Sequence, residues 1–207
     1  FLTALTPKLA RVVTSSVPYE GKTTLGCNLA TALGKMERVL LLEADMRKPS
    51  IRHVYGIGKG QPGLADVVAR NAEINEAIYK FDGIDVMACG TLPPNPLELL
   101  SSRRFSDLLE RLDHTYDRIV IDSPPVQAVS DSLVLSTHAN TVVYIIKADA
   151  TTTPVARKGL MRLLEVDAPI AGVVLSHVDI SKAAKYGYGY QYANAGYYDY
   201  YGYGKDD

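Results

Sequence analysis

A phosphate-binding loop is the first chemical feature that the residue types indicate. Residues 16–24 have the sequence Ser-Val-Pro-Tyr-Glu-Gly-Lys-Thr-Thr, which fits the pattern G-x-x-x-x-G-K-[ST] with serine in place of the first glycine. Gly21 allows close approach of the backbone to a phosphate, Lys22 can reach the β- and γ-phosphates of ATP, and Thr23 can bind Mg²⁺. We therefore predict that ATP and Mg²⁺ are bound by a loop made of Ser16, Val17, Pro18, Tyr19, Glu20, Gly21, Lys22, Thr23 and Thr24.

A second acidic position lies at the end of an apolar run. Residues 119–125 have the sequence Ile-Val-Ile-Asp-Ser-Pro-Pro. An aspartate at the carboxyl end of a buried strand can hold Mg²⁺ beside a nucleotide, usually through water. Taken alone, Asp122 could equally be a strand-ending residue that caps a turn. Beside the phosphate-binding loop, we predict that it is a metal ligand.

A third motif supplies two more carboxylates. The run Leu-Leu-Leu at residues 40–42 is followed by Glu43, Asp45, Arg47 and Lys48. In an extended chain, residues two apart point to the same side, so Glu43 and Asp45 could share a metal and polarise an attacking hydroxyl. The alternative is a solvated loop. We predict Thr23, Asp45 and Asp122 as metal ligands, and Lys22, Asp45, Glu43, Asp122 and Arg47 as catalytic residues.

These motifs need elements that hold them together, and the rest of the chain predicts an α/β fold. Strands are expected at residues 10–15, 39–43, 85–88, 118–122, 141–147 and 170–175, and helices at 22–35, 64–70, 74–79, 103–112, 130–137 and 154–165. Such alternation is typical of a doubly wound, mainly parallel sheet with helices on both faces. Helical spacing in the first helix predicts a core-facing stripe of Leu25, Leu29, Ala32 and Leu33. Pro93, Pro94 and Pro96 predict a non-helical approach to the segment after Leu97.

Composition limits the classes of protein. The chain has 207 residues, 47% of them hydrophobic and 22% charged, which is ordinary for a globular domain. A net charge of -1 argues against nucleic acid as a partner held by phosphate neutralisation, although a local basic patch would escape this count. No apolar run is long enough to span a membrane and no signal peptide is evident. Cys27 and Cys89 lack a C-x-x-C spacing and are expected to be reduced thiols.

The carboxyl-terminal segment differs sharply in composition. After about Asp179, tyrosine and glycine alternate with no leucine, isoleucine or valine, except Ile180, so we expect a flexible tail. We divide the chain into a domain at residues 1–179 and a tyrosine-rich tail at 180–207. Because the first residue is Phe1 rather than methionine, we also expect an excised domain. The tail's candidate phosphate acceptors are Tyr186, Tyr188, Tyr190, Tyr192, Tyr197, Tyr198, Tyr200, Tyr201 and Tyr203.

Together, the three motifs and the tail resemble the bacterial tyrosine kinases, the cytoplasmic domains of polysaccharide co-polymerases. That family has a P-loop fold related to the MinD and ParA ATPases. Its Walker A, Walker A′ (D-x-D-x-R) and Walker B (D-x-P-P) motifs are similar to residues 16–23, 40–47 and 119–125, and its P-N-P-x-E-L-L segment to residues 94–100. The resemblance covers about residues 10–203.

The resemblance implies an activity and a setting. It implies that the γ-phosphate of ATP is transferred to the tail tyrosines, favouring a neighbouring copy as acceptor, and that this regulates exopolysaccharide or capsule synthesis and export. It also implies a homo-oligomer, possibly a ring, a transmembrane co-polymerase segment on the amino-terminal side, a cognate tyrosine phosphatase, and a cytoplasmic location at the inner face of the plasma membrane.

The sequence departs from the family in four places. Glu43 replaces the first aspartate of Walker A′, Val17 stands where MinD and ParA proteins have a second lysine, and Ser50 occupies the place of a regulatory tyrosine in some members. The E-x-x-R-x-x-R oligomerisation motif would lie upstream of the loop and is not in this sequence. The main alternative function is a MinD/ParA-type ATPase switch; a non-enzymatic interaction domain with an aromatic tail is another.

Overall fold

A seven-stranded sheet forms the centre of the protein. The computed structural model describes residues 10–179, so residues 1–9 and the predicted tail, with its nine tyrosines, lie outside the described part. The strands are β1 (Ala10–Ser15), β2 (Val39–Glu43), β3 (Tyr79–Phe81), β4 (Ile84–Met87), β5 (Arg118–Asp122), β6 (Thr141–Lys147) and β7 (Ile170–Ser176). Their order in the sheet is β3-β4-β2-β5-β1-β6-β7, and every pairing is parallel except β3 with β4.

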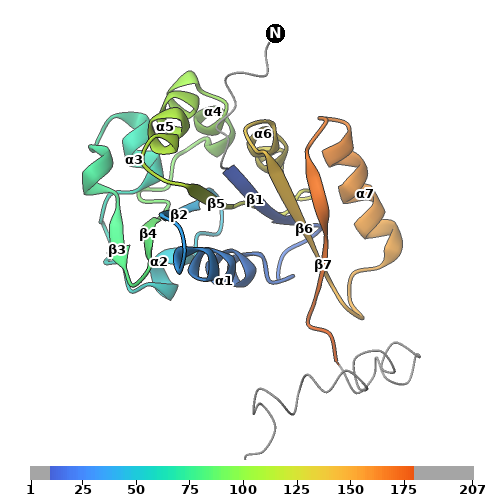
Figure 1. Cartoon of the computed structure of the whole chain (residues 1–207). Coiled ribbons are helices and arrows are strands. Elements are labelled where there is room, and N and C mark those ends of the chain that lie inside the picture. The colour runs from blue at the N-terminus through green and yellow to red at the C-terminus, as the bar shows by residue number, and fades with distance from the viewer. Residues whose placement is uncertain (1–9, 180–207) are drawn as a thin grey trace, which may run out of the picture.

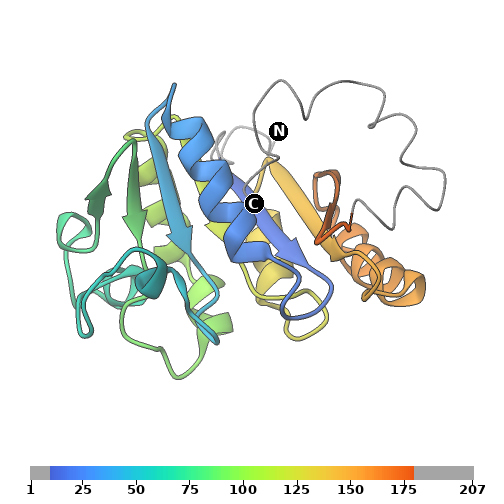
Figure 2. The same ribbon diagram turned by 90° about the horizontal axis from the view of Figure 1, so that it is seen from below.

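Helices cover both faces of this sheet (Figures 1 and 2). They are α1 (Lys22–Gly34), α2 (Ile51–Val54), α3 (Leu64–Ala69), α4 (Pro96–Leu100), α5 (Arg103–Asp113), α6 (Asp131–Thr137) and α7 (Thr153–Leu164), with a 3-10 turn, η1, at Ile74–Glu76. One apolar cluster packs α1 and α2 against one face, and a larger cluster packs α3 to α7 against the other. The predicted fold class, a doubly wound and mainly parallel sheet, is confirmed.

Three local predictions need correction. Residues 74–79 are not a helix: only Ile74–Glu76 form a 3-10 turn, and Tyr79 starts an edge strand because it pairs with Val86. The segment around Pro96 is not wholly non-helical, since Pro96 is the first residue of α4, where its missing N–H costs nothing. In α1, Leu25, Leu29 and Leu33 pack against the core as predicted, but Ala32 is exposed, and the buried positions of the helix include Gly26 and Ala30.

The carboxyl ends of the central strands meet at one edge of the sheet. Both Ala44 and Asp45 donate their backbone N–H groups to the carbonyl oxygen of Asp122, at 2.8 and 3.1 Å. The end of β2 is therefore fixed against the end of β5, next to β1 and the loop that follows it. Among residues 10–179, no helix has the length and apolar character needed to cross a membrane.

Candidate nucleotide site

The loop between β1 and α1 has the backbone shape that a phosphate cradle needs. Gly21 adopts a left-handed conformation with φ 91°, and α1 begins at the next residue, Lys22. The amino end of α1 therefore points its free N–H groups into the loop, where they favour a negative charge. Tyr19 also has a left-handed backbone, with φ 66°.

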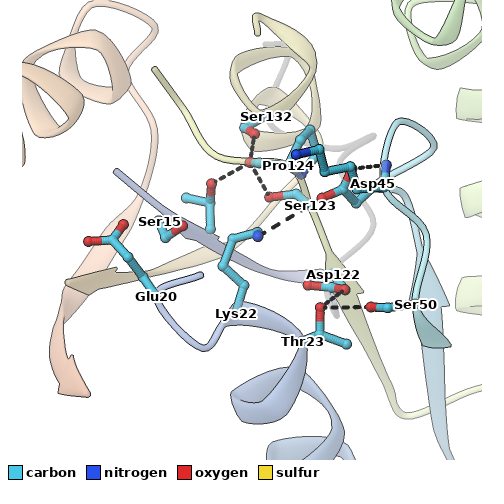
Figure 3. Close-up of polar contacts among 12 residues, drawn as sticks. Ser15, Glu20, Lys22, Thr23, Asp45, Ser50, Asp122, Ser123, Pro124 and Ser132 are labelled. Carbon is cyan, nitrogen blue, oxygen red and sulfur yellow. Dashed lines mark hydrogen bonds and ion pairs between the residues drawn. The ribbon is translucent and has the colours of Figure 1, made fainter. Parts of the chain in front are cut away.

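Thr23 and Asp122 form the polar floor of the site (Figure 3). The Thr23 hydroxyl donates to Asp122 Oδ2 at 2.7 Å, and Ser50 Oγ lies 3.4 Å from the same threonine oxygen. The other carboxylate oxygen, Asp122 Oδ1, is buried and has no hydrogen-bond partner among the described residues. Burial raises the pKa of Asp122 to about 7, against the opposing effects of Thr23 and Lys22.

This arrangement fits Mg²⁺ bound together with a nucleotide. An unpaired, buried carboxylate oxygen beside a threonine hydroxyl is costly by itself, and a hard divalent cation would compensate both oxygens. In the described part of the chain, no group of three or more His, Cys, Asp or Glu could hold a metal alone. The lack of such a cluster is compatible with Mg²⁺, because Mg²⁺ in nucleotide sites is held by few protein oxygens, with phosphates and waters as its other ligands.

Lys22 and Asp45 face each other across the mouth of the site. Their Nζ and Oδ2 atoms are 3.9 Å apart, and both side chains are about nine-tenths buried. Asp45 Oδ1 also accepts the backbone N–H of Lys48 at 3.1 Å, which fixes the loop after β2 (Figure 3). The structure thus brings together four of the predicted residues: Lys22, Thr23, Asp45 and Asp122.

Glu43 and Arg47 make their hydrogen bonds to other protein groups. Glu43 is fully buried, and its oxygens accept backbone N–H groups from Ser50 at 2.5 Å, Ile51 at 2.6 Å and Cys89 at 2.9 Å. Burial raises the pKa of Glu43 despite these donors. Arg47 makes a two-bond contact with buried Asp131, at 2.9 and 3.1 Å. Both side chains therefore act on neighbouring protein groups, and a role in positioning fits them better than one on phosphate or metal.

Glu20 connects the loop to a distant part of the sheet, which sequence reasoning did not anticipate. Its buried carboxylate accepts the N–H of Val17 at 2.7 Å, the N–H of Lys147 at 3.2 Å and the hydroxyl of Thr151. Its carbonyl oxygen accepts the hydroxyl of Ser176, at the end of β7, at 2.7 Å. The carboxyl ends of β6 and β7 are thereby fixed to the loop.

Ser16, which replaces the first glycine of the phosphate-binding pattern, forms a hydrogen bond that glycine could not form. Its hydroxyl is 2.7 Å from the phenolic oxygen of Tyr144, a fully buried residue of β6 that also donates to the carbonyl of Ala156 at 3.2 Å. A Cβ on Gly159 would collide with the same phenolic oxygen. The serine thus joins the loop to β6 and α7 through a contact for which the local sequence contains no signal.

The turn after β5 is held in a similar way. The carbonyl oxygen of Pro124 accepts hydroxyls from Thr14 at 2.9 Å, Ser123 at 3.5 Å and Ser132 (Figure 3). Beside it lies a cavity of about 430 Å³. The lining residues come from all three motifs: Pro18, Tyr19, Gly21, Lys22, Thr23, Thr24, Asp45, Arg47, Lys48, Ser50, Pro124, Pro125, Ala128 and Val129.

The chain is similar in sequence and fold to known proteins. Residues 20–174 match the AAA domain family. YwqD of Bacillus subtilis, a tyrosine-protein kinase, is 32% identical over 180 residues, which are 86% of this chain and 76% of YwqD. This chain belongs to the bacterial tyrosine-protein kinase family. The kinase domain of VpsO, a solved structure, is 40% identical, with a TM-score of 0.81 over 86% of this chain and 88% of that domain.

Two further similar proteins are less informative about this chain, one because it is much longer and one because its sequence identity is low. EpsB of Ralstonia solanacearum is 34% identical over 91% of this chain, but the chain spans only 25% of its length. MinD of Pyrococcus horikoshii, solved as a complex with Mg-ADP, has a TM-score of 0.66 over 81% of this chain and 69% of the MinD chain, at 23% identity. The second likeness concerns the fold alone.

Proposed function

We propose that this domain is an ATP-dependent protein-tyrosine autokinase that uses Mg²⁺ and phosphorylates tyrosines of its own carboxyl-terminal segment. One observation carries the proposal: the Thr23 hydroxyl lies 2.7 Å from Asp122, whose second oxygen is buried without a partner, in a site that also contains Lys22 and Asp45. The family likeness to tyrosine-protein kinases supports the choice of acceptor.

Each residue has a distinct part in the proposed reaction. Lys22 would bind the β- and γ-phosphates, and Thr23 and Asp122 would hold Mg²⁺, which neutralises phosphate charge when it is bound. A tyrosine hydroxyl has a pKa near 10, so it attacks poorly unless it is aligned. Asp45 lies within 3.9 Å of Lys22 and is the side chain best placed to orient that hydroxyl. Positioning and charge stabilisation dominate phosphoryl transfer.

The position of β7 supports the tail as substrate. Ser176 at the end of β7 bonds to Glu20 of the loop, and the His177 ring lies where it would be 3.6 Å from a Cβ on Gly21. The described chain therefore passes beside the nucleotide loop at Ser176 and His177, shortly before the predicted tail. Tyr186 is seven residues beyond Asp179, a contour length of up to about 25 Å. We propose transfer to a neighbouring copy, as the family resemblance favours.

The wider setting belongs to the same proposal. We place the domain at the cytoplasmic face of the plasma membrane, as part of a larger co-polymerase in a homo-oligomer. A cognate phosphatase would reverse the modification, and the cycle would regulate exopolysaccharide or capsule synthesis. These elements rest on the family and on relatives such as Etk of Escherichia coli, a tyrosine-protein kinase of which this chain spans 25%.

The test is phosphotyrosine formation by purified chain and Mg-ATP. Lys22→Met and Asp122→Asn should each lower it by at least about a hundredfold, since each removes a charge from the transition state. Asp117→Asn is the matched control: Asp117 is half-exposed, lies just before the amino end of the same strand, and is paired with Arg38 at 2.8 Å. It should keep near wild-type activity. Full activity in a folded Lys22→Met or Asp122→Asn variant would overturn the site assignment.

A mixing experiment tests transfer between copies. A Lys22→Met chain with an intact tail is incubated with an active chain whose nine tail tyrosines are replaced by phenylalanine. Phosphate on the Lys22→Met chain is expected. If only chains that carry both an active site and a tail become labelled, transfer occurs within one chain.

A further inference from the structure

Tyr19 is an unusual residue for its position in the nucleotide loop. Its side chain is 81% exposed, and its backbone is in the left-handed region with φ 66°. The turn that imposes this conformation is fixed from both sides, because the Glu20 carboxylate accepts the N–H of Val17 and contacts Lys147 and Thr151. A glycine would adopt the same backbone without strain, whereas a tyrosine there is unfavourable.

The location of the ring suggests what balances this strain. Tyr19 lies on the rim of the cavity that contains Lys22 and Thr23, the residues expected at the phosphates. Apolar residues also line this cavity: Pro124, Pro125, Ala128 and Val129. An acceptor tyrosine with its hydroxyl at the γ-phosphate would place its ring in this cavity, where Tyr19 is part of the lining.

Lys48, from the third motif, contacts the Tyr19 ring. Its ammonium nitrogen is 5.7 Å from the centroid of the ring, within cation–π range. The backbone of Lys48 is in turn fixed to Asp45. The exposed ring therefore contacts a residue of the same loop that carries the acid proposed to orient the acceptor.

We propose that the Tyr19 ring is the surface on which the acceptor tyrosine packs, so that Tyr19 determines preference for tyrosine in the substrate. Offset or edge-to-face packing of two aromatic rings is favourable beyond the area it buries. The proposal rests on the kinase function proposed above and adds a recognition element that the phosphate-binding pattern does not require.

The experiment measures KM and kcat of the full chain toward a synthetic peptide with the sequence of residues 184–194, which contains Tyr186, Tyr188, Tyr190 and Tyr192. Phosphopeptide is quantified by mass spectrometry at saturating Mg-ATP. Tyr19→Gly removes the ring and relieves the backbone, so loss of folding is not expected. Its KM for the peptide should rise about five- to tenfold, with kcat within about threefold of wild type. Tyr19→Phe, which keeps the ring, should restore the wild-type KM.

Two controls sharpen the result. Met36→Ala removes an exposed apolar side chain just beyond the far end of α1, 91% exposed, and should leave the peptide KM unaltered. Lys48→Met should give a smaller rise in the peptide KM than Tyr19→Gly does, because it frees the ring without removing it.

The alternative outcomes are distinct. Equal peptide KM for wild type and Tyr19→Gly would overturn the inference while leaving the kinase function intact. A rise in the KM for ATP alone would assign the ring to the nucleotide and also overturn it. If Tyr19→Phe behaves like Tyr19→Gly, the hydroxyl rather than the ring is needed, which overturns the packing role. If wild type forms phosphotyrosine on its own tail but not on the peptide, the inference is overturned and the kinase function stands; if it forms neither, both are overturned.

Discussion

Replacing Glu43 tests whether this side chain binds Mg²⁺ or stabilises the fold through its hydrogen bonds to the backbone. The carboxylate accepts three backbone N–H groups, from Ser50 and Ile51 at the start of α2 and from Cys89 after β4. The residue is fully buried. We therefore predict that Glu43→Gln changes stability far more than it changes the requirement for Mg²⁺.

The magnitude follows from these contacts. Glutamine is isosteric, and its amide oxygen can still accept from Ser50 and Ile51, but its NH₂ group would face the N–H of Cys89. One mismatched buried donor costs about 1–3 kcal/mol. The urea m-value of a domain of this size is about 2 kcal/mol/M, so the urea concentration at the midpoint of unfolding should fall by about 0.5–1.5 M. Glu43→Ala leaves three donors unpaired and should cost at least about 3 kcal/mol.

Two measurements on the same samples decide the question. Urea unfolding gives the free energy of unfolding, and the Mg²⁺ concentration for half-maximal activity reports on the metal. For Glu43→Gln we expect the first to fall and the second to stay within about threefold of wild type. Asp122→Asn is the positive control, since it should raise the Mg²⁺ requirement. A Glu43→Gln variant that has wild-type stability but needs ten times more Mg²⁺ would contradict a purely structural role for Glu43.

Four further predictions concern other contacts. Gly159→Ala should destabilise the fold by about 1–3 kcal/mol, because its Cβ would collide with the Tyr144 phenol, and Tyr144→Phe should partly relieve this in a double-mutant cycle measured by urea unfolding. Ser176→Ala should raise the KM for ATP several-fold, measured by steady-state kinetics, since it removes the 2.7 Å bond to the loop. Burial lowers the pKa of His138; the unfolded chain then binds the proton more readily, so wild type should lose stability relative to His138→Gln as pH falls through 6.5 in pH-dependent unfolding. Phosphorylation of all nine tail tyrosines would add roughly -14 to -18 charges, and phosphorylated chain should sediment as a smaller assembly than dephosphorylated chain.

Most of the strands, and the contact between Thr23 and Asp122, follow from the sequence. The apolar runs at β1, β2, β5 and β6 are bounded by polar residues, so their limits were predicted as the structure has them. The proximity of Thr23 and Asp122 follows from parallel strands whose carboxyl ends share one edge of the sheet. The short helices α2 and α4, of four and five residues, escape such reasoning because they are too brief to show a helical period.

The orientation of Glu43 could not be predicted, for a geometric reason. The expectation that Glu43 and Asp45 point the same way assumes an extended chain through both residues, but β2 ends at Glu43. Beyond that residue the chain bends toward Asp122, whose carbonyl accepts the N–H of Asp45. The two acids consequently face different surroundings.

Long-range side-chain contacts were equally invisible in the sequence. Glu20 and Tyr144 have partners more than 120 residues away along the chain. Tyr144 occupies an apolar strand, where nothing distinguishes it from a core residue. The left-handed backbone at Tyr19 has no local signal either, since glycine, its usual marker, is absent there.

The most direct test of the kinase function compares two products in one reaction. The full chain is incubated with Mg-ATP, and the ADP released and the phosphotyrosine formed on residues 180–207 are measured over time, with Lys22→Met as the blank. A tyrosine autokinase should form about one phosphotyrosine for each ADP until the tail is saturated. Steady release of ADP without phosphotyrosine on the tail would contradict the kinase assignment and indicate an ATPase switch.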